Sequence, residues 1–143
     1  MCSSDLVKRL DSSEKARVVA SNADRQVAEA FRTLHSSLRL KDESKNAKAF
    51  LTTSTIPGEG KTFITTNLAI TFASHGEKVI VVDCDLRKPN VHKSLGLENT
   101  KGTIDIASGK ATIEEAVFKD VLPNLDVIVA GGRAKNQIGR AHV

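Results

Sequence analysis

Apolar side chains recur at helical spacing in one segment near the start of the chain. Four of them share one helix face at spacings of four, three and four: Val27, Phe31, Leu34 and Leu38. This periodicity predicts an amphipathic helix over residues 25–40. Either Asn22 or Asp24 is expected to start it, because both residue types favour helix N-termini.

Three short apolar runs have the composition of strands: residues 47–51, 79–82 and 125–129. The second run is continuously β-branched, which is typical of a strand covered on both faces of a parallel sheet. Helices are expected from near Lys61 to His75, with Gly76 as the C-cap, and as short segments at 103–108 and 112–117. This alternation predicts an α/β fold with a parallel β-sheet flanked by helices in three α/β/α layers.

A glycine-rich segment, residues 52–62, lies between the first run and the helix that follows it. Its sequence is Thr-Thr-Ser-Thr-Ile-Pro-Gly-Glu-Gly-Lys-Thr, and a strand, a glycine loop ending in Gly-Lys-Thr and a helix form the P-loop arrangement. Gly58 and Gly60 allow the backbone to aim consecutive N–H groups at a phosphate, and the helix N-terminus adds free amides. The alternative is a glycine-rich turn that only caps a helix, which the strand–loop–helix context disfavours.

The loop departs from the usual pattern at one position. That pattern opens with a glycine six places before the lysine, where this chain has Thr55. Lys61 is expected to reach the β- and γ-phosphates of a nucleotide, and the Thr62 hydroxyl is expected to lie on Mg²⁺. The predicted nucleotide-binding residues are Thr55, Ile56, Pro57, Gly58, Glu59, Gly60, Lys61, Thr62 and Phe63.

A pair of acids follows the second apolar run. In extended chain Asp83 and Asp85 project to one side, about 6–7 Å apart, and Cys84 projects to the other, where we expect a small buried residue. Ligands of open α/β sheets gather at the carboxyl ends of strands, where both this pair and the glycine loop lie. The pair is therefore suited to hold Mg²⁺ or to accept a proton from an attacking hydroxyl. The alternative is a polar strand end with solvated aspartates.

The two ends of the chain have an unusual relationship. Residues 1–6 and 137–142 have potential coding sequences that are reverse complements of each other, and both resemble translated sequencing-adapter DNA. We therefore expect 1–6 and 137–143 to be foreign to the protein and exclude them from reasoning about the fold. On this interpretation residues 7–21 are a linker, and 22–136 are a partial P-loop domain that is incomplete at its C-terminus.

Composition narrows the possible functions. The 143 residues allow at most one domain, and the net charge of +4 is modest and scattered, so no nucleic-acid partner is expected. No apolar run reaches the length of a membrane span, and no secretory signal is recognisable. Without the suspect end, Cys84 is the single cysteine, which fits a cytoplasmic protein. The chain contains no tyrosine.

Both motifs resemble those of the bacterial tyrosine kinases (BY-kinases) of capsule and exopolysaccharide production. The family's Walker A loop has Thr-Ser, three variable residues and then Gly-Glu-Gly-Lys-Ser/Thr, which residues 53–62 match with Thr55 in a variable place. Its Walker A′ motif, an apolar run followed by Asp-x-Asp and Arg, is matched by residues 79–87. The resemblance covers about residues 22–136.

Three further segments are similar to the same family. It carries Glu-x-x-Arg-x-x-Arg on a helix used in ring assembly; Glu29 and Arg32 match this motif, and His35 stands in the third place. An ordinary surface ion pair is the alternative for Glu29 and Arg32. Residues 102–110 look like the family's short helix region, and Gly131-Gly132 followed by Asn136 looks like its glycine turn.

The resemblance implies an ATP- and Mg²⁺-dependent protein-tyrosine autokinase that regulates capsular or exopolysaccharide synthesis and export. It implies Lys61, Asp83 and Asp85 as catalytic residues and Thr62, Asp83 and Asp85 as metal ligands. The implied partners are ATP, a membrane chain-length regulator or activator, fused or separate, and further copies in a ring through Glu29 and Arg32. The implied location is the cytoplasmic face of the inner or plasma membrane.

Two parts of the family pattern have no counterpart in the sequence: the Walker B strand and the tyrosine-rich tail. The chain by itself is therefore expected to bind ATP weakly and to transfer no phosphate to itself on tyrosine. Two other classes share the fold. A partition- or division-type nucleotide-switch ATPase needs a signature lysine five residues before Lys61, where this chain has Ile56. A non-catalytic nucleotide-binding module would be expected to carry other residues in place of Lys61, Thr62 or the aspartates, and none of these residues is replaced.

Overall fold

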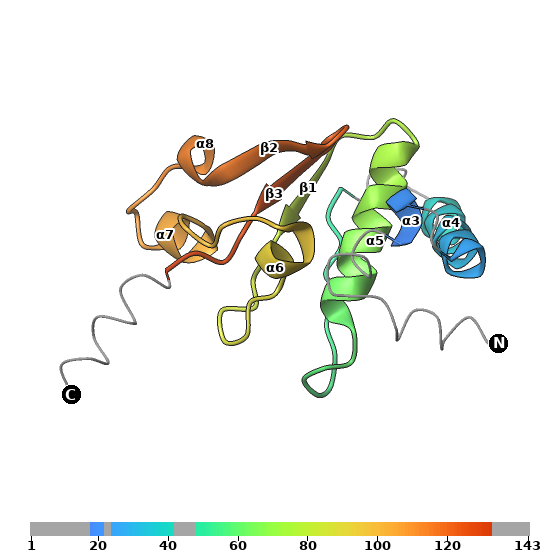
Figure 1. The fold of residues 1–143 in the computed structure, drawn as a ribbon, viewed down its shortest axis with the longest axis horizontal. Helices are drawn as coiled ribbons and strands as arrows, with labels where there is room; N and C mark the ends of the chain where they lie inside the picture. The colour runs from blue at the N-terminus through green and yellow to red at the C-terminus, as the bar shows by residue number, and fades with distance from the viewer. Residues whose placement is uncertain (1–17, 22–23, 42–47, 133–143) are drawn as a thin grey trace.

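The computed structural model describes residues 18–21, 24–41 and 48–132, and Figure 1 shows how they are arranged. The helices are α3 (Val18–Ser21), α4 (Arg25–Lys41), α5 (Lys61–Ser74), α6 (Val91–Leu95), α7 (Thr103–Ala107) and α8 (Ile113–Ala116). The strands are β1 (Val79–Val82), β2 (Val117–Leu122) and β3 (Leu125–Ile128). Within these ranges no helix is long and apolar enough to cross a membrane.

Helix α4 is the amphipathic helix predicted from the apolar spacing. Asp24 caps its start, because its Oδ1 accepts hydrogen bonds from the N–H groups of Gln26 (3.0 Å) and Val27 (3.1 Å). Asn22, the other expected start, lies outside the described residues. A short polar acceptor at this place satisfies amides that have no partner inside the helix.

The buried face of α4 is rotated slightly from the predicted one. Ala28, Phe31 and His35 are buried, whereas Leu34 is 36% exposed. The Phe31 ring contacts Phe63 of α5 edge to face, with 5.7 Å between ring centroids. The polar residue His35 therefore takes a core position that the apolar pattern had assigned to leucine.

The sheet has three strands in the order β1-β3-β2. Strands β1 and β3 are parallel, with Val79 opposite Leu125 and Val82 opposite Ile128. Strand β2 runs antiparallel to β3, so the described sheet is mixed, whereas the sequence predicted a parallel sheet. The parallel pairing of β1 with the central strand β3 was predicted correctly.

The antiparallel strand arises in a segment whose start was predicted as helix. Thr112 caps α8 with its side chain, but the helix ends at Ala116. The following Val117-Phe118 has high β propensity and pairs with β3. A turn with Asn124 in the left-handed region (φ 64°) joins β2 to β3. The local sequence predicts where α8 begins, whereas β2 forms only because β3 lies beside it.

The expected first strand, residues 47–51, is not formed. Residues 48–54 carry no regular secondary structure, and residue 47 lies outside the described ranges. The side chains of Phe50 and Leu51 are 49% and 88% exposed. A strand is stabilised by hydrogen bonds to a neighbouring strand, and β1 pairs only with β3 in the described part of the chain.

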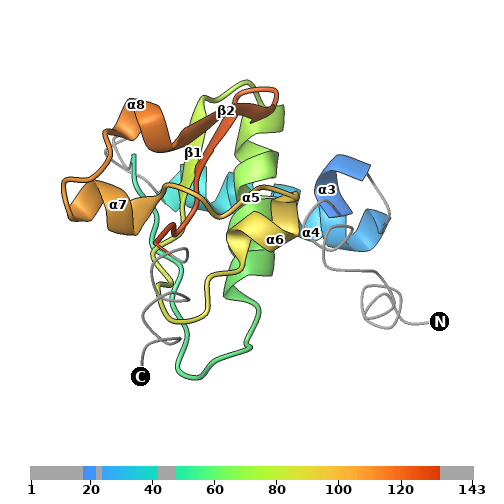
Figure 2. The same ribbon diagram turned by 60° about the vertical axis from the view of Figure 1, so that its left-hand side comes forward.

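Helices α5 and α6 pack on one face of the parallel pair, as Figures 1 and 2 show. The core joins the two helices to the sheet through Ala69, Ile70, Ala73, Val81, Val91, Leu95, Leu125, Val127 and Val129. Ile80 and Val82, on the other face of β1, are 49% and 44% exposed. The expectation that β1 is covered on both faces therefore fails within the described residues.

Candidate nucleotide-binding site

The glycine loop ends in two left-handed glycines at the start of α5. Gly58 has φ 84°, and Gly60, the N-cap of α5, has φ 93°. A Cβ at either position would meet no atom within 4 Å, so the backbone conformation, not lack of space, requires glycine. No side chain among the described residues caps this end of α5. Its first amides therefore face the loop, as a phosphate site requires.

Lys61 lies across the mouth of the loop. Its Nζ donates a hydrogen bond to Ser54 Oγ at 3.0 Å, and Ser54 Oγ donates in turn to the carbonyl oxygen of Ile56 at 2.9 Å. The ammonium group is thus held over the segment that would surround a phosphate. Ser54 was not among the predicted site residues, although it belongs to the Thr-Ser pair that matched the kinase loop.

Glu59 closes the outer part of the same loop. Its Oε2 accepts hydrogen bonds from the backbone N–H of Thr55 at 3.0 Å and of Ile56 at 3.4 Å. Ile56 is 60% exposed, so this part of the loop has little support from the core. These contacts depend on how the loop folds back, so no local pattern of residues predicts them.

The remaining loop residues differ in their surroundings. Pro57 is exposed, whereas Thr62 and Phe63 are half-buried. The carbonyl oxygen of Thr62 accepts a hydrogen bond from Thr66 Oγ1 at 2.7 Å, and the Thr62 hydroxyl makes none within the described residues. Phe63 contributes its ring to the contact between α4 and α5. Among the residues that the structure describes, the Thr62 hydroxyl is therefore available to a ligand, whereas the Phe63 ring is engaged with α4.

Asp83 is the most constrained of the predicted site residues. It is 5% exposed and follows the last residue of β1. Its Oδ1 accepts a hydrogen bond from the N–H of Asp85 at 3.0 Å, and its Oδ2 accepts one from the N–H of Val91 at 3.2 Å. One carboxylate thus joins the end of the strand to the start of α6.

Asp85 is more accessible than Asp83. It is half-buried, and its Oδ1 accepts a hydrogen bond from the N–H of Lys88 at 3.0 Å. Its Oδ2 makes no hydrogen bond within the described residues. Cys84 between the two acids is exposed, so its predicted burial was wrong. The fully extended geometry that underlay this prediction does not continue past β1, because Asp83 turns the chain by accepting the Asp85 amide.

Helix α7 contacts the acid loop through a hydrogen bond to the backbone of Asp83. Thr103 Oγ1 donates to the carbonyl oxygen of Asp83 at 2.8 Å. Gly102, the residue before it, lies so close to β3 that a Cβ would meet the Val129 carbonyl oxygen at 2.0 Å. Gly131 and Gly132, which were predicted to form a glycine turn, both have positive φ, 74° and 71°. Thr103 is 20 residues from Asp83 in the sequence, so only the folded structure shows that the two residues are in contact.

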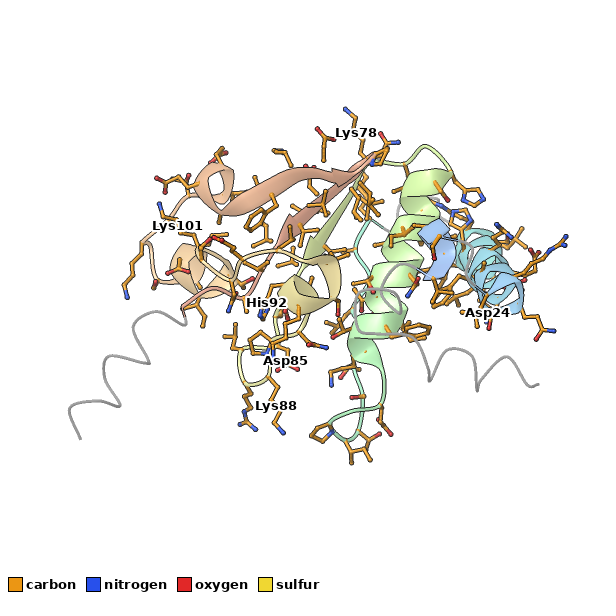
Figure 3. The ribbon with its side chains drawn as sticks, in the orientation of Figure 1. Asp24, Lys78, Asp85, Lys88, His92 and Lys101 are labelled. Atoms are coloured by element: carbon orange, nitrogen blue, oxygen red, sulfur yellow. The ribbon has the colours of Figure 1, made fainter. Side chains whose placement is uncertain are left out.

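Both predicted loops lie at the same end of the molecule. Figures 1 and 2 place the glycine loop and the loop after β1 at the lower end of each view, and Figure 3 labels Asp85 and Lys88 there. No hydrogen bond or ion pair in the described residues joins Lys61 or Thr62 to either aspartate. No three His, Cys, Asp or Glu side chains in those ranges form a metal-binding group. A ligand that contacts both loops would have to bridge them.

The residues that resemble the assembly motif divide into two environments. Glu29 and Arg32 form an exposed ion pair on α4 at 2.9 Å. His35 instead packs against α5, with its ring stacked on His75 at 4.3 Å and its Nε2 3.1 Å from Glu77 Oε1. Burial, followed by the nearby His75 and Arg39, lowers the pKa of His35 below the usual value for histidine. His35 therefore joins two helices and does not share the exposed position of Glu29 and Arg32.

Comparison with protein families identifies the fold. The family described as the CobQ/CobB/MinD/ParA nucleotide binding domain matches residues 50–135, more than half of the 143-residue chain. The match includes the glycine loop and the acid pair. It confirms the predicted α/β P-loop class, although the described sheet is mixed.

Comparison with individual proteins finds tyrosine kinases. The tyrosine-protein kinase YwqD of Bacillus subtilis is 38% identical over 104 residues, which cover 73% of this chain and 44% of YwqD. The tyrosine-protein kinase wzc of Salmonella typhimurium is 34% identical over 103 residues, which cover 72% of this chain and 14% of that protein. The chain thus spans less than half the length of either relative.

Solved structures give the same result. The chimerical protein CapA2B2 superposes with a TM-score of 0.71 at 25% identity, covering 89% of this chain and 61% of that one. The kinase domain of the Escherichia coli tyrosine kinase ETK superposes with a TM-score of 0.69 at 28% identity, covering 86% and 49%. The chain therefore belongs to the CobQ/CobB/MinD/ParA nucleotide-binding family, and bacterial tyrosine kinases are among its relatives.

Proposed function

We propose that the chain is part of the catalytic domain of an ATP-dependent protein-tyrosine autokinase that regulates capsular or exopolysaccharide synthesis and export. The observation that carries this proposal is the shared position of the Lys61 loop and the Asp83–Asp85 loop at one end of the fold. Phosphoryl transfer depends on positioning and on charge stabilisation, and these two loops offer both. The named activities of YwqD and wzc support the same function.

The proposed mechanism assigns separate tasks to the two loops. The loop amides and Lys61, whose ammonium group Ser54 holds over the loop, bind the β- and γ-phosphates of ATP. One aspartate of the acid pair accepts the proton of the attacking tyrosine hydroxyl, and the other helps to hold the metal. The substrate tyrosine belongs to another part of the protein or to another molecule, because these 143 residues contain none.

The residues present fit Mg²⁺. This ion prefers oxygen ligands and binds through one or two carboxylates, phosphates and retained water molecules. Thr62 offers a hydroxyl with no hydrogen bond in the described residues, Asp85 offers Oδ2, and Asp83 offers the remaining lone pairs of its two oxygens. When bound, the ion would neutralise charge on the transferred phosphate.

The similarity to bacterial tyrosine kinases also supports proposals for how the domain assembles and where in the cell it lies. We place the domain at the cytoplasmic face of the inner or plasma membrane, with a membrane chain-length regulator or activator as its partner, fused or separate. The exposed Glu29 and Arg32 on α4 would take part in a homo-oligomeric ring. His35, buried against α5, would contribute by fixing the helix and not by direct contact.

The two alternative functions are less favoured. A nucleotide-switch ATPase of the partition type would need a lysine where the chain has the exposed Ile56. A non-catalytic module would tolerate loss of Lys61, Thr62 or the aspartates, and all four are retained. The chain by itself is proposed to be inactive, because it lacks a tyrosine acceptor and spans less than half of YwqD.

The decisive test is Lys61→Ala in the full-length protein. Without the ammonium group, phosphotyrosine formed with ATP and Mg²⁺ is expected to fall by about 100-fold or more, because this charge is needed in the transition state. Immunoblotting for phosphotyrosine measures the effect. The matched control is Lys110→Ala, which removes an exposed lysine outside the site. A phosphotyrosine level in Lys61→Ala equal to that of the wild type would overturn the proposal.

A further inference from the structure

Three hydrogen-bonding side chains connect the glycine loop into one network. We define this loop network as Ser54, Thr55, Ile56, Glu59 and Lys61. Lys61 Nζ donates to Ser54 Oγ, Ser54 Oγ donates to the Ile56 carbonyl oxygen, and Glu59 Oε2 accepts from the N–H of Ile56 and Thr55. The Ile56 peptide groups are thus held from both sides, by Ser54 on the carbonyl and by Glu59 on the amide.

We propose that Glu59 is a positioning residue for nucleotide binding: its carboxylate holds the Thr55–Ile56 amides, and through Ser54 this fixes the place of the Lys61 ammonium group. The inference rests on the proposed nucleotide-binding function. The sequence placed Glu59 among the nucleotide-binding residues without a specific role, and the proposed role is one in which Glu59 acts through the loop and does not touch the ligand.

The replacement of the usual first glycine explains why the loop needs such a contact. A glycine at position 55 would give the chain freedom to turn with positive φ, whereas Thr55 is not among the described residues that have positive φ. The start of the loop therefore has to turn with ordinary backbone angles, unlike its other end, where Gly58 and Gly60 have positive φ. Two N–H groups that point to one side need an acceptor, and the carboxylate of Glu59 supplies it.

The charge of Glu59 opposes a direct contact between this side chain and a phosphate. A carboxylate two residues from Lys61 is unfavourable beside a triphosphate, since like charges repel. The loop is also exposed, so the hydrogen bonds of Glu59 add little to the stability of the whole domain. We expect Glu59 to keep the loop ordered before the nucleotide binds. A loop that must become ordered on binding lowers the affinity, so the loss of Glu59 should weaken nucleotide binding.

The test compares Glu59→Ala with Glu59→Gln in the full-length protein. Alanine removes the acceptor and the charge, whereas glutamine keeps one acceptor oxygen and removes only the charge. We expect the dissociation constant for MgATP, measured by isothermal titration calorimetry, to rise about tenfold in Glu59→Ala and only about two- to threefold in Glu59→Gln. The KM for ATP should rise with it, while kcat at saturating ATP changes less.

Two further variants complete the design. Glu114→Ala removes an exposed glutamate on α8, far from the loop in sequence, and should leave affinity unchanged. Ser54→Ala should weaken MgATP binding, and its effect should be less than additive with Glu59→Ala, because both residues hold the same peptide groups. Melting temperatures of all variants should stay close to that of the wild type.

Several outcomes would overturn the inference. Wild-type affinity in Glu59→Ala would show that the contact is dispensable, and tighter binding would show that the carboxylate competes with phosphate for the amides. Equal losses in the alanine and glutamine variants would assign the effect to charge and not to the hydrogen bonds. If the wild-type protein itself does not bind MgATP, the proposed function fails together with this inference, whereas normal wild-type binding isolates the role of Glu59.

Discussion

The two loops at the candidate site are held in opposite ways. The acid loop after β1 is tied to the core: Asp83 is 5% exposed, and both of its carboxylate oxygens accept backbone N–H groups. The glycine loop is exposed, with Ile56 at 60%, and it is held by its own side chains, Glu59 and Ser54. One loop takes its shape from the fold, and the other takes it from contacts within itself.

Because the two loops are held differently, substitutions in them should affect the stability of the domain and its affinity for nucleotide to different extents. Changes in the acid loop should disturb the folded domain and the site together, because its hydrogen bonds also join β1 to α6 and α7. Changes in the glycine loop should alter nucleotide affinity and leave the melting temperature nearly unchanged. Loops that bind ligands often have low local stability, and ordering them is part of the free energy of binding.

Asp83→Ala should show the largest effect on stability. It leaves the N–H groups of Asp85 and Val91 without their acceptor, and we expect the free energy of unfolding to fall by about 3 kcal/mol. Phosphotyrosine formation in the full-length protein should be lost as well. Urea unfolding followed by circular dichroism measures the first effect, and immunoblotting measures the second.

Asp85→Ala is the matched control for this contrast. Asp85 accepts a single amide and is half-buried, so its loss should cost about 1 kcal/mol of stability. Lys61→Ala, in the exposed loop, should cost less still. If Asp83→Ala unfolds at the same urea concentration as Lys61→Ala, the claimed difference between the two loops is wrong.

Gly102→Ala should have the next largest effect. The new Cβ would lie 2.0 Å from the Val129 carbonyl oxygen, so α7 must move away from β3, at a cost of about 2 kcal/mol. That movement would also disturb the hydrogen bond from Thr103 to the Asp83 carbonyl. Thermal unfolding of the variant measures the cost.

Gly109→Ala tests whether the cost at Gly102 is steric. Gly109 has φ 70° and open space around it, so alanine there meets only backbone strain of about 1 kcal/mol. Gly102 has extended backbone (φ −164°), so its cost must come from close approach. A smaller loss at Gly102 than at Gly109 would contradict the tight contact between α7 and β3.

Features fixed by neighbouring residues were predictable from the sequence. The helix at 25–41 follows from its apolar spacing, and Asp24 caps it as expected. The glycine loop and the Asp83–Asp85 pair were recognised because their chemistry requires particular residue types at short spacing. The parallel pairing of β1 with β3 followed from the alternation of strands and helices.

Features that depend on distant partners were missed. Residues 47–51 have strand composition, but a strand needs a neighbouring strand, and residues 48–51, the described part of this run, have none in the described sheet. The β2 strand forms because β3 returns beside it. The support of Asp83 by Val91 and Thr103 joins residues 8 and 20 positions away, which no local pattern records.

A third region, at the C-terminal end of α5, contrasts with the two loops. His35 of α4 lies there among His75, Glu77 and the ring of Phe72, and Arg39 forms an ion pair with Glu77. Although Glu77 accepts a hydrogen bond from His35, it shares its charge with Arg39. Burial and the two neighbouring bases therefore keep the pKa of His35 low.

The lowered pKa of His35 predicts the smallest effect, a loss of stability in acid. The folded state binds this proton less readily than the unfolded state, so the stabilisation is complete above about pH 6.5 and is lost as pH falls through the lower, folded-state pKa. Melting temperatures between pH 7.5 and pH 5 should therefore fall more in the wild type than in His35→Gln. His75→Gln should reduce the slope in part, because it removes one cause of the shift. No hydrogen bond, ion pair or ring contact within the described ranges joins this cluster to either loop, so MgATP affinity measured at pH 7.5 should be the same in all three proteins. An acid slope unchanged in His35→Gln would assign the effect to other groups.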